Sequence, residues 1–521
     1  MDPGRFLDRR GFLQLGAVAG AAAGAALLGG CGAESPTPTT TTSTTTLGPP
    51  VAADWRSLAS SLRGSPVLST NPAWQLDRLL YNSKFDPRPL AIAYCSTPDD
   101  VARCLHFATS REVPFAARSG GHSYGGYSSA PGLVIDVSGM SRIAVDLRAG
   151  TAVVSAGAKL IDVYNEIGSR GRLLPGGSCP TVGIAGLALG GGVGVFGRKF
   201  GLTSDNVRSV RIVTPDARIV TADDSTHADL LWACRGGGGG NYGVVTSFEF
   251  IVHAMPEVTL FTLQYPWEAG ATALEAWQHW VDGAPDELWS NFLLLSEGTA
   301  GYLCQTSGVF CGSRSELASL LAPLKAAIGS GPSASFIGSN DYISAMEIEA
   351  GCSGLSIASC HLAPEGKLSR SAYSAKSSYF DDPMTSAQVK HMIEAVENLQ
   401  RSSPTIGGGL AFDSYGGAIN RVASDATAFV HRDKLACIQA TYSWSAYTPA
   451  SEIAAGERWL TWLGDHVFNP RSGAYQNYID PTLSEWQTAY YGANLARLVK
   501  VKHAYDPDGL FTFAQSIPTT I

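Results

Sequence analysis

The sequence predicts a two-domain α+β protein, and three observations lead to that fold class. The chain has 521 residues, 45% of them hydrophobic, which is enough for two or three cores at ~150 residues per domain. Between residues 97 and 252, short β-branched strands alternate with helices. Beyond Pro256 the glycine density falls, tryptophans accumulate, and strands again alternate with helices, which indicates a second domain.

The individual elements follow from local patterns. Helices are predicted where an N-cap or a terminating glycine brackets an amphipathic run, namely from a Thr97 cap to Ala108, over Ala158–Arg170 and over Thr226–Cys234. A Pro-Asp turn between two apolar runs predicts a hairpin of Val207–Thr214 with Arg218–Thr221. The other predicted strands are Val113–Ala117, Leu133–Val137, Thr151–Ser155, Gly243–Val252, Leu260–Tyr265, Phe292–Leu295 and Leu435–Tyr442.

The first 31 residues predict an export signal rather than part of the fold. Arg9-Arg10 before an Ala/Gly-rich apolar run is typical of a twin-arginine signal, and Leu28-Gly29-Gly30-Cys31 resembles a site at which a lipoprotein is cleaved and lipidated. An uncleaved transmembrane anchor is the alternative. Residues 32–53 form a Thr/Pro-rich tether, so the folded body should begin near Ala53. We therefore expect a cell-surface lipoprotein that contacts the membrane only through Cys31.

Charge and cysteine content exclude some classes of partner. The net charge of −8 argues against nucleic acid. No CxxC or HExxH spacing occurs, so no metal site is predicted. An oxidising compartment permits disulfides, and eight of the ten cysteines remain once Cys31 and Cys179 are set aside. Their connectivity stays open, although the close pairs Cys304/Cys311 and Cys352/Cys360 could each close a short loop.

Two glycine-rich loops carry the residues that are candidates for ligand binding and catalysis. Arg118 to Gly126 (Arg-Ser-Gly-Gly-His-Ser-Tyr-Gly-Gly) follows a strand, and its backbone N–H groups can converge on a phosphate, with His122 beside the ligand. Gly176 to Gly183 places Cys179 in a rigid turn before Ile184–Gly197, which we interpret as a loop close to the ligand. Gly192 to Gly197 matches the dinucleotide pattern, but no strand precedes it and no crossover helix fits before Val207.

These loops, together with two further motifs, resemble the berberine-bridge-enzyme-like flavin oxidases. The further motifs are the run from Arg235 to Val245 (Arg-Gly-Gly-Gly-Gly-Gly-Asn-Tyr-Gly-Val-Val) and the run from Tyr475 to Asp480 (Tyr-Gln-Asn-Tyr-Ile-Asp). The resemblance implies the PCMH-type FAD-binding fold of the vanillyl-alcohol-oxidase superfamily, with a substrate domain built on an antiparallel sheet covered by helices. It also implies FAD attached twice, through the 8α carbon to His122 and through C6 to Cys179.

The resemblance further implies the domain limits. Residues 54–255 would bind FAD, residues 256–470 would bind substrate, and residues 471–521 would return to the FAD domain. Cofactor contacts are expected from Arg118, Ser119, Gly120, Gly121, His122, Ser123, Gly177, Cys179, Val182, Gly183, Gly186, Asn241, Val245 and Asn477.

Three residues are expected at the chemical step. By resemblance Tyr478 is the base that removes the hydroxyl proton, Gln439 faces the flavin from the second domain, and Tyr124 completes the site. The alternatives are a core aromatic for Tyr478 and an ordinary strand residue for Gln439.

The expected activity is oxidation of a small-molecule alcohol to a carbonyl compound. Val182 resembles the residue of oxygen-accepting members, which predicts O₂ as acceptor and H₂O₂ as product. Val193 replaces a tyrosine of the carbohydrate-oxidising and plant members, which favours a more apolar alcohol over a simple sugar. A flavoprotein that only sequesters a ligand and a solute-binding lipoprotein without flavin are the alternatives.

Overall fold

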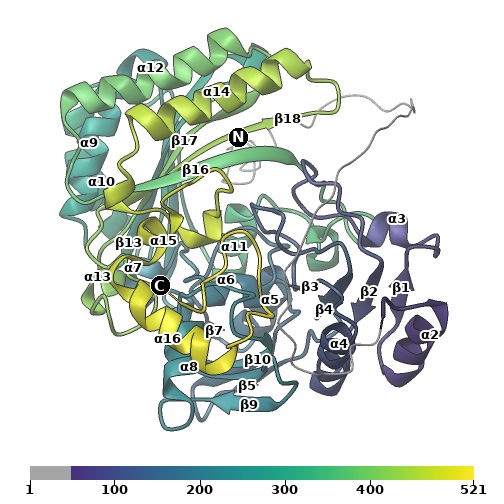
Figure 1. Cartoon of the computed structure of the whole chain (residues 1–521). Helices are drawn as coiled ribbons and strands as arrows, with labels where there is room; N and C mark the ends of the chain where they lie inside the picture. Colours follow the sequence, from purple (N-terminus) through teal and green to yellow (C-terminus); the bar gives the residue numbers. More distant parts are fainter. Residues whose placement is uncertain (1–47, 521) are drawn as a thin grey trace.

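The computed structural model describes residues 48–520 (Figure 1). The predicted signal with Cys31, and the tether up to residue 47, lie outside the described residues. The folded body begins with helix α2 (Ala52–Ser61), close to the expected start at Ala53. Within the described part of the chain, no helix is long and apolar enough to cross a membrane.

A small mixed sheet opens the first half. Its order is β1-β2-β4-β3, with β2 and β3 both parallel to β4 and helix α4 packed on β4. The predicted α4 is confirmed: Thr97 caps it and Asp100 completes a capping box. The strands are β1 (Pro66–Leu68), β2 (Ala91–Tyr94), β3 (Phe115–Arg118) and β4 (Leu133–Asp136), and α4 covers Pro98–Ser110.

A second sheet of the first half has the order β5-β6-β10-β8-β9 and is antiparallel throughout. The predicted hairpin is confirmed as β8 and β9. The strands are β5 (Ile143–Asp146), β6 (Thr151–Ser155), β8 (Val207–Val213), β9 (Ile219–Ala222) and β10 (Val244–Ile251). The associated helices are α5 (Leu160–Gly168), α6 (Ile184–Leu189) and α8 (Ala228–Cys234).

Helix α6 corrects the prediction of an irregular loop over Ile184–Gly197. Its six residues form a short helix because Ile184, Ala185, Ala188 and Leu189 bury one face against the core. The glycine-rich remainder begins at Gly190 and stays irregular up to the short helix α7 (Gly197–Phe200).

The second half is built on a seven-stranded antiparallel sheet, in the order β15-β12-β14-β13-β17-β18-β16. One face packs against four long helices (Figure 1), and the other turns toward the first half. The helices are α9 (Gly270–Asp282), α10 (Arg314–Ile328), α12 (Ser386–Ser402) and α14 (Ala450–His466). The strands are β12 (Val258–Tyr265), β13 (Leu288–Glu297), β14 (Tyr302–Phe310), β15 (Ala334–Asn340), β16 (Ala372–Phe380), β17 (Gly407–Ser414) and β18 (Ala436–Trp444).

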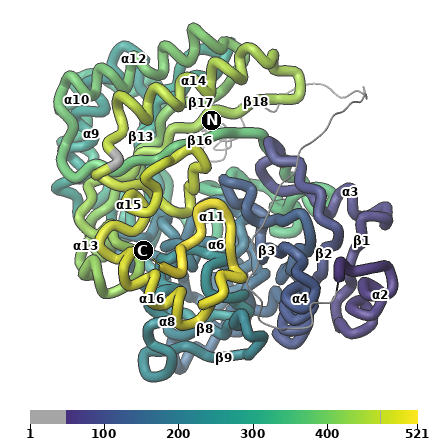
Figure 2. Tube along the Cα trace, in the orientation of Figure 1, coloured from purple at the N-terminus to yellow at the C-terminus, as the bar shows by residue number. Residues whose placement is uncertain are grey.

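The end of the chain returns to the first half. Helices α15 (Trp486–Tyr491) and α16 (Leu495–Tyr505) follow the second sheet, and α16 packs against α8 (Figure 2). Lys502 anchors this return: its buried ammonium donates to the Asn241 carbonyl at 2.7 Å and pairs with Asp506 at 2.6 Å.

Of the two short cysteine pairs, one forms and one does not. Cys352 and Cys360 form a disulfide. Cys304 and Cys311 do not pair, because Cys304 lies early in β14 and Cys311 follows its end, so an extended strand separates them. The suggestion that Cys304 and Cys311 close a short loop is therefore wrong.

Candidate active site

A cavity of about 840 Å³ lies where the two halves and the returning segment meet. Most of its wall comes from residues 108–131, 177–193, 239–245, 475–479 and 509–514, while the second sheet contributes Tyr373 and Gln439. Among the predicted residues, the following line it: Arg118, Ser119, Gly120, Gly121, His122, Ser123, Tyr124, Gly177, Cys179, Val182, Gly183, Gly186, Val245, Gln439, Asn477 and Tyr478.

The two glycine-rich loops are packed directly against each other. A Cβ on Gly120 would lie 2.2 Å from the Gly183 nitrogen, and a Cβ on Gly183 would lie 2.0 Å from the Ser119 Oγ. Only glycines allow this approach. Contact between the loops therefore fixes the positions of His122 and Cys179 relative to each other.

The first loop is also tied to the sheet behind it. The Arg118 guanidinium forms a buried ion pair with Asp136, Ser119 Oγ donates to the Ala156 carbonyl at 2.6 Å, and Lys159 Nζ donates to the Ser119 carbonyl at 2.9 Å. These contacts hold the backbone N–H groups of the loop in place before any ligand binds.

His122 is held as a neutral imidazole. Its Nε2 lies 2.9 Å from Thr181 Oγ1, and its ring stacks on Tyr81 with centroids 4.0 Å apart. Burial, with the positive charges of Lys159 and Arg370, lowers the pKa of His122 to about 3. The ring therefore carries a lone pair on one nitrogen at neutral pH.

The three residues expected at the chemical step come together on one side of the cavity. Gln439 Nε2, on β18, donates to the Tyr124 hydroxyl at 2.9 Å. The Tyr124 ring stacks on Tyr478 with centroids 5.2 Å apart, and Tyr478 belongs to the short 3₁₀ helix Gln476–Tyr478. One cluster therefore joins the first loop, the second sheet and the returning segment.

Tyr475, which packs edge-on against Tyr478 with centroids 4.8 Å apart, holds the glycine-rich loop at Gly192 and Val193. Its hydroxyl accepts from the backbone N–H of Gly192 at 2.9 Å and of Val193 at 3.1 Å, and from Asn477 Nδ2 at 2.9 Å. Asn477 also donates to the Leu187 carbonyl at 3.0 Å. Val193 thus borders the cavity with an aliphatic side chain and a fixed backbone.

Asn241 is the predicted contact residue that does not line the cavity. Its side chain donates to the carbonyls of Gly237 and Gly238 at 3.2 and 3.3 Å, and its Oδ1 accepts from the Ile517 N–H at 2.9 Å. It shapes the glycine loop behind the wall and joins that loop to the end of the chain.

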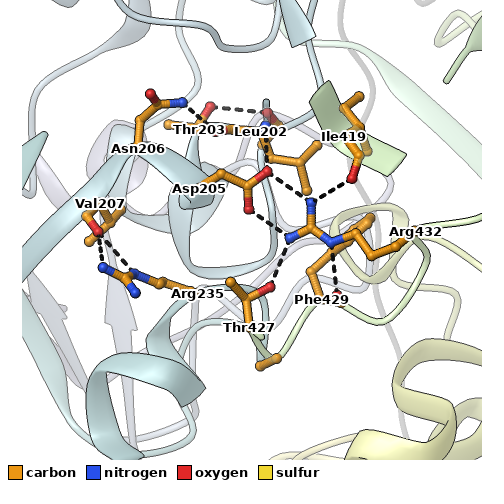
Figure 3. A network of polar contacts seen from close by, with 12 residues as sticks. Leu202, Thr203, Asp205, Asn206, Val207, Arg235, Ile419, Thr427, Phe429 and Arg432 are labelled. Atoms are coloured by element: carbon orange, nitrogen blue, oxygen red, sulfur yellow. Dashed lines mark hydrogen bonds and ion pairs between the residues drawn. The ribbon is translucent and has the colours of Figure 1, made fainter. Parts of the chain in front are cut away.

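A buried ion pair between Asp205 and Arg432 lies next to Phe429 (Figure 3). Arg432 binds Asp205 through two nitrogens, at 2.8 and 2.6 Å, and also donates to Thr427 Oγ1 at 2.8 Å. Its guanidinium lies over the Phe429 ring, 5.0 Å from the centroid. Phe429 in turn touches Tyr475 edge-on at 6.2 Å, so the ion pair supports the residues that hold Val193 and Asn477.

Sequence reasoning missed several residues of this site. Tyr81, Thr181 and Tyr373 line the cavity or touch His122, and Lys159 and Arg370 set the charge around it. Tyr373 packs edge-on against Tyr124 with centroids 5.0 Å apart. Thr181 follows Cys179 in the same loop and could have been found from that position, but the others lie in stretches without a local pattern.

The site fits the FAD that the resemblance implies. Nothing lies within 4 Å of where a Cβ on Gly186 would sit, so the cavity passes directly against that backbone. Arg118 lines the cavity, and its buried Nη1 has no hydrogen-bond partner within the described residues. A dinucleotide with anionic phosphates supplies an acceptor for such a donor.

Comparison with known proteins supports the same assignment. Residues 89–223 match the family model "FAD binding domain", and residues 474–518 match "Berberine and berberine like". An FAD-linked oxidoreductase of Bacillus subtilis (strain 168), YvdP, itself uncharacterized, is 33% identical over 88% of this chain and 99% of its own.

Solved structures show the same fold. BBE-like 1 of Physcomitrella patens has a TM-score of 0.81 at 29% identity, covering 89% of this chain and 99% of its own. Glucooligosaccharide oxidase from Acremonium strictum, with a 6-S-cysteinyl, 8α-N1-histidyl FAD, has a TM-score of 0.79 at 27% identity over the same shares. The expected two-domain α+β, PCMH-type fold is thereby confirmed. The chain therefore belongs to the berberine-bridge-enzyme-like family of FAD-linked oxidoreductases, and its cofactor is FAD.

Proposed function

We propose that this protein is an oxidase that carries FAD attached to both His122 and Cys179, oxidises an alcohol and passes the electrons to O₂. The observation that supports this most directly is the meeting of three groups in one cavity. His122 and Cys179 line it on packed loops, and Tyr124, Gln439 and Tyr478, which contact one another, line it as well.

The two attachments suit the residues that make them. A neutral imidazole and a thiolate are the side chains able to form bonds to an electron-poor flavin ring. The glucooligosaccharide oxidase with a 6-S-cysteinyl, 8α-N1-histidyl FAD supports the same pair of bonds in this chain. When bound, the flavin accepts a hydride from substrate and returns two electrons to O₂.

The protein's own residues would bind the alcohol and remove its proton. Tyr478 takes the hydroxyl proton, while Gln439 and Tyr124, hydrogen-bonded to each other at 2.9 Å, orient the carbinol. Val182 also lines the cavity, and its resemblance to the residue of oxygen-accepting members is what supports O₂ as acceptor.

The wall around these residues favours an uncharged alcohol with an apolar or aromatic body. Tyr81, Tyr124, Tyr373, Tyr475 and Tyr478 line this part of the cavity together with Val193. The acidic and basic side chains that line the cavity, Glu112 and Arg118, come from the segment that precedes His122. Aromatic faces bind apolar and aromatic ligands well.

The test uses the mature domain, expressed from Ala53, together with His122→Ala, Cys179→Ala and the double variant. Protein is precipitated with acid, and the pellet is examined by visible spectrum and intact mass. Flavin that survives either single change but not both establishes two attachments. A colourless pellet with a yellow supernatant contradicts covalent attachment, and no yellow at all favours a binding lipoprotein.

Alcohol oxidation is tested on the same protein. A panel of primary and secondary alcohols is added without oxygen, and bleaching of the flavin absorbance is recorded, followed by peroxide formation on aeration. Bleaching with rapid reoxidation by air supports an oxidase. Bleaching that air does not reverse contradicts O₂ as acceptor, and bound flavin that no alcohol bleaches favours a ligand-sequestering protein.

We also propose that the protein reaches the cell surface by twin-arginine export and is anchored through Cys31. This route suits a flavoprotein, because FAD can be loaded in the cytoplasm before export. Changing Arg9-Arg10 to Lys-Lys should retain the protein in the cytoplasm, and Cys31→Ala should release it from the membrane fraction. Unchanged fractionation of both variants would contradict the proposal.

A further inference from the structure

The loop that carries Cys179 also supplies a hydrogen-bonding partner for His122. Thr181 Oγ1 lies 2.9 Å from His122 Nε2, and Thr181 is buried, with only 3% of its surface exposed. The backbone carbonyls on either side of Thr181 accept hydrogen bonds of 3.0 Å from the first turn of α5. These bonds hold the backbone that carries the hydroxyl, and burial limits the movement of the side chain.

A second contact fixes the plane of the imidazole. Tyr81 stacks on the ring with centroids 4.0 Å apart and an interplanar angle of 18°. The Tyr81 N–H donates to the Gly121 carbonyl at 3.1 Å, so the stacking partner is bound to the same loop as His122. Stacking on Tyr81 sets the plane of the imidazole, and the contact of Nε2 with Thr181 sets the orientation of the ring in that plane. The direction in which Nδ1 points is therefore defined.

The contact with Thr181 Oγ1 is compatible with both neutral tautomers of His122, and one of the two leaves Nδ1 able to react. The burial described above keeps the imidazole neutral, so one nitrogen carries a proton and the other a lone pair. A hydroxyl can accept from an N–H or donate to a lone pair. When Nε2–H donates to Thr181 Oγ1, the lone pair lies on Nδ1.

We propose that Thr181 is a positioning residue for the covalent attachment of FAD to His122. It accepts the Nε2 proton and leaves the Nδ1 lone pair to form the bond, a role that rests on the attachment proposed above. After attachment, Nε2 loses its proton and the Thr181 hydroxyl changes from acceptor to donor, so the contact persists in both states.

The electrons and atoms of the step balance with O₂ as the oxidant. The bond that forms joins His122 Nδ1 to the 8α carbon, and the bonds that break are one methyl C–H bond and the imidazole N–H bond. The electron pair of the C–H bond passes into the flavin ring. O₂, the acceptor of the proposed function, takes this pair together with the two released protons and becomes H₂O₂.

The experiment isolates the histidine bond in a Cys179→Ala parent, in which His122 is the remaining attachment point. Thr181→Val and Thr181→Ser are added to this parent, and each protein is prepared without flavin from riboflavin-starved cells. FAD is then added in aerated buffer, and the fraction of protein with the added flavin mass is followed over time. Non-covalent FAD affinity is measured anaerobically on the same samples.

We expect Thr181→Val to bind FAD as the parent does but to attach it about tenfold more slowly or worse, the effect of losing one hydrogen bond. Thr181→Ser should attach FAD at a rate close to the parent's. The matched control is Thr246→Val, because Thr246 is a buried threonine of the same half whose hydroxyl donates to the Arg211 carbonyl at 3.1 Å.

Equal attachment rates in the parent and Thr181→Val overturn the role of Thr181. If the valine variant loses its affinity for FAD, the comparison passes to Thr181→Ser against Thr181→Ala, and equal rates for these two overturn it as well. A parent that gains no flavin mass shows instead that attachment to His122 is wrong, which removes the proposal together with that part of the proposed function.

Discussion

At the scale of single residues, Tyr478 is the side chain whose hydroxyl should matter to oxidation but not to flavin binding. Tyr478→Phe keeps the ring that stacks on Tyr124 at 5.2 Å. We expect flavin reduction by the best alcohol to slow by ~100-fold or more, the usual contribution of a positioned base. Anaerobic rapid mixing measures the rate, and the visible spectrum checks that flavin is still bound.

The control for this prediction is Tyr265→Phe. Tyr265 is also buried, but it packs into the core between the second sheet and its helices. Loss of the Tyr265 hydroxyl should leave the rate of flavin reduction unchanged. A Tyr478→Phe protein that is reduced as fast as the control would remove Tyr478 as the base.

His431 makes the protein sensitive to acid. The ring is buried, its Nε2 has no hydrogen-bond partner within the described residues, and burial with the nearby Lys434 charge lowers its pKa to about 3. In the unfolded chain a histidine binds a proton near pH ~6.5. Between these two pH values the unfolded state binds more protons, so the free energy of unfolding falls as pH falls, by at most ~1.4 kcal/mol per pH unit.

His431→Phe should remove this part of the pH dependence, because the substituted ring has no group that titrates. Urea unfolding at several pH values between ~7 and ~4 measures it, since stability depends on pH wherever proton binding differs between the two states. His106→Phe, a change at an exposed histidine, is the control. Equal pH slopes in wild type and His431→Phe would contradict the assignment to His431.

How far the sequence predicts the site depends on whether its residues are contiguous. His122, Cys179 and Tyr478 lie in short motifs with glycines or aromatics around them, and the structure places all three at one cavity. Tyr81 and Tyr373 reach the same cavity from segments with no local pattern, because only the folding of distant chain brings them there. Asn241 sits in a recognisable motif, yet its side chain faces the loop backbone instead of the cavity.

At the scale of elements, the ion pair between Asp205 and Arg432 connects a 3₁₀ turn of the first half to the segment that carries Phe429. The two side chains are 10% and 3% exposed. Removing either partner leaves a buried charge, so Asp205→Ala and Arg432→Ala should each cost ~3–5 kcal/mol of unfolding free energy. The double variant should cost less than the sum of the two, which urea unfolding of all three measures.

The matched pair for this cycle is Lys199 with Glu287, which lie 2.8 Å apart but are 28% and 39% exposed. Solvent screens such a pair, so its alanine variants should cost only ~0–1 kcal/mol. If the unfolding free energies lost in Asp205→Ala and Arg432→Ala add up to the loss in the double variant, the two residues do not act as a pair.

Elements with strong end signals could be predicted, and those held by their neighbours could not. Helix α4 has a Thr97–Asp100 capping box and was predicted at nearly its observed limits. Strand β17 begins with three glycines, which disfavour strands. It forms because β13 and β18 hydrogen-bond to it on both sides, a condition that no local pattern contains.

At the scale of the whole molecule, the alternation of strands and helices predicts two domains but not how they are joined. The order β15-β12-β14-β13-β17-β18-β16 mixes neighbours and non-neighbours in the chain. The cavity needs both halves, since Tyr124 comes from the first and Gln439 from the second, and their hydrogen bond is a long-range contact. Such contacts are fixed by packing across the interface, which periodicity along the chain does not report.

The returning segment should be required for flavin binding. Residues 475–479 and 509–514 form part of the cavity wall. The buried Lys502 Nζ donates to the Asn241 carbonyl at 2.7 Å and to the Phe511 carbonyl at 2.6 Å, and so links the segment to the first half. A chain that ends at Gly473 loses that wall and leaves apolar surface of the first half exposed, so it should be recovered without flavin and should aggregate. A chain that ends at Pro518 keeps every lining residue and should stay yellow through gel filtration. If the shorter chain also kept its flavin, the glycine loops of the first half would be sufficient to hold FAD, and the segment would serve the substrate side of the cavity alone.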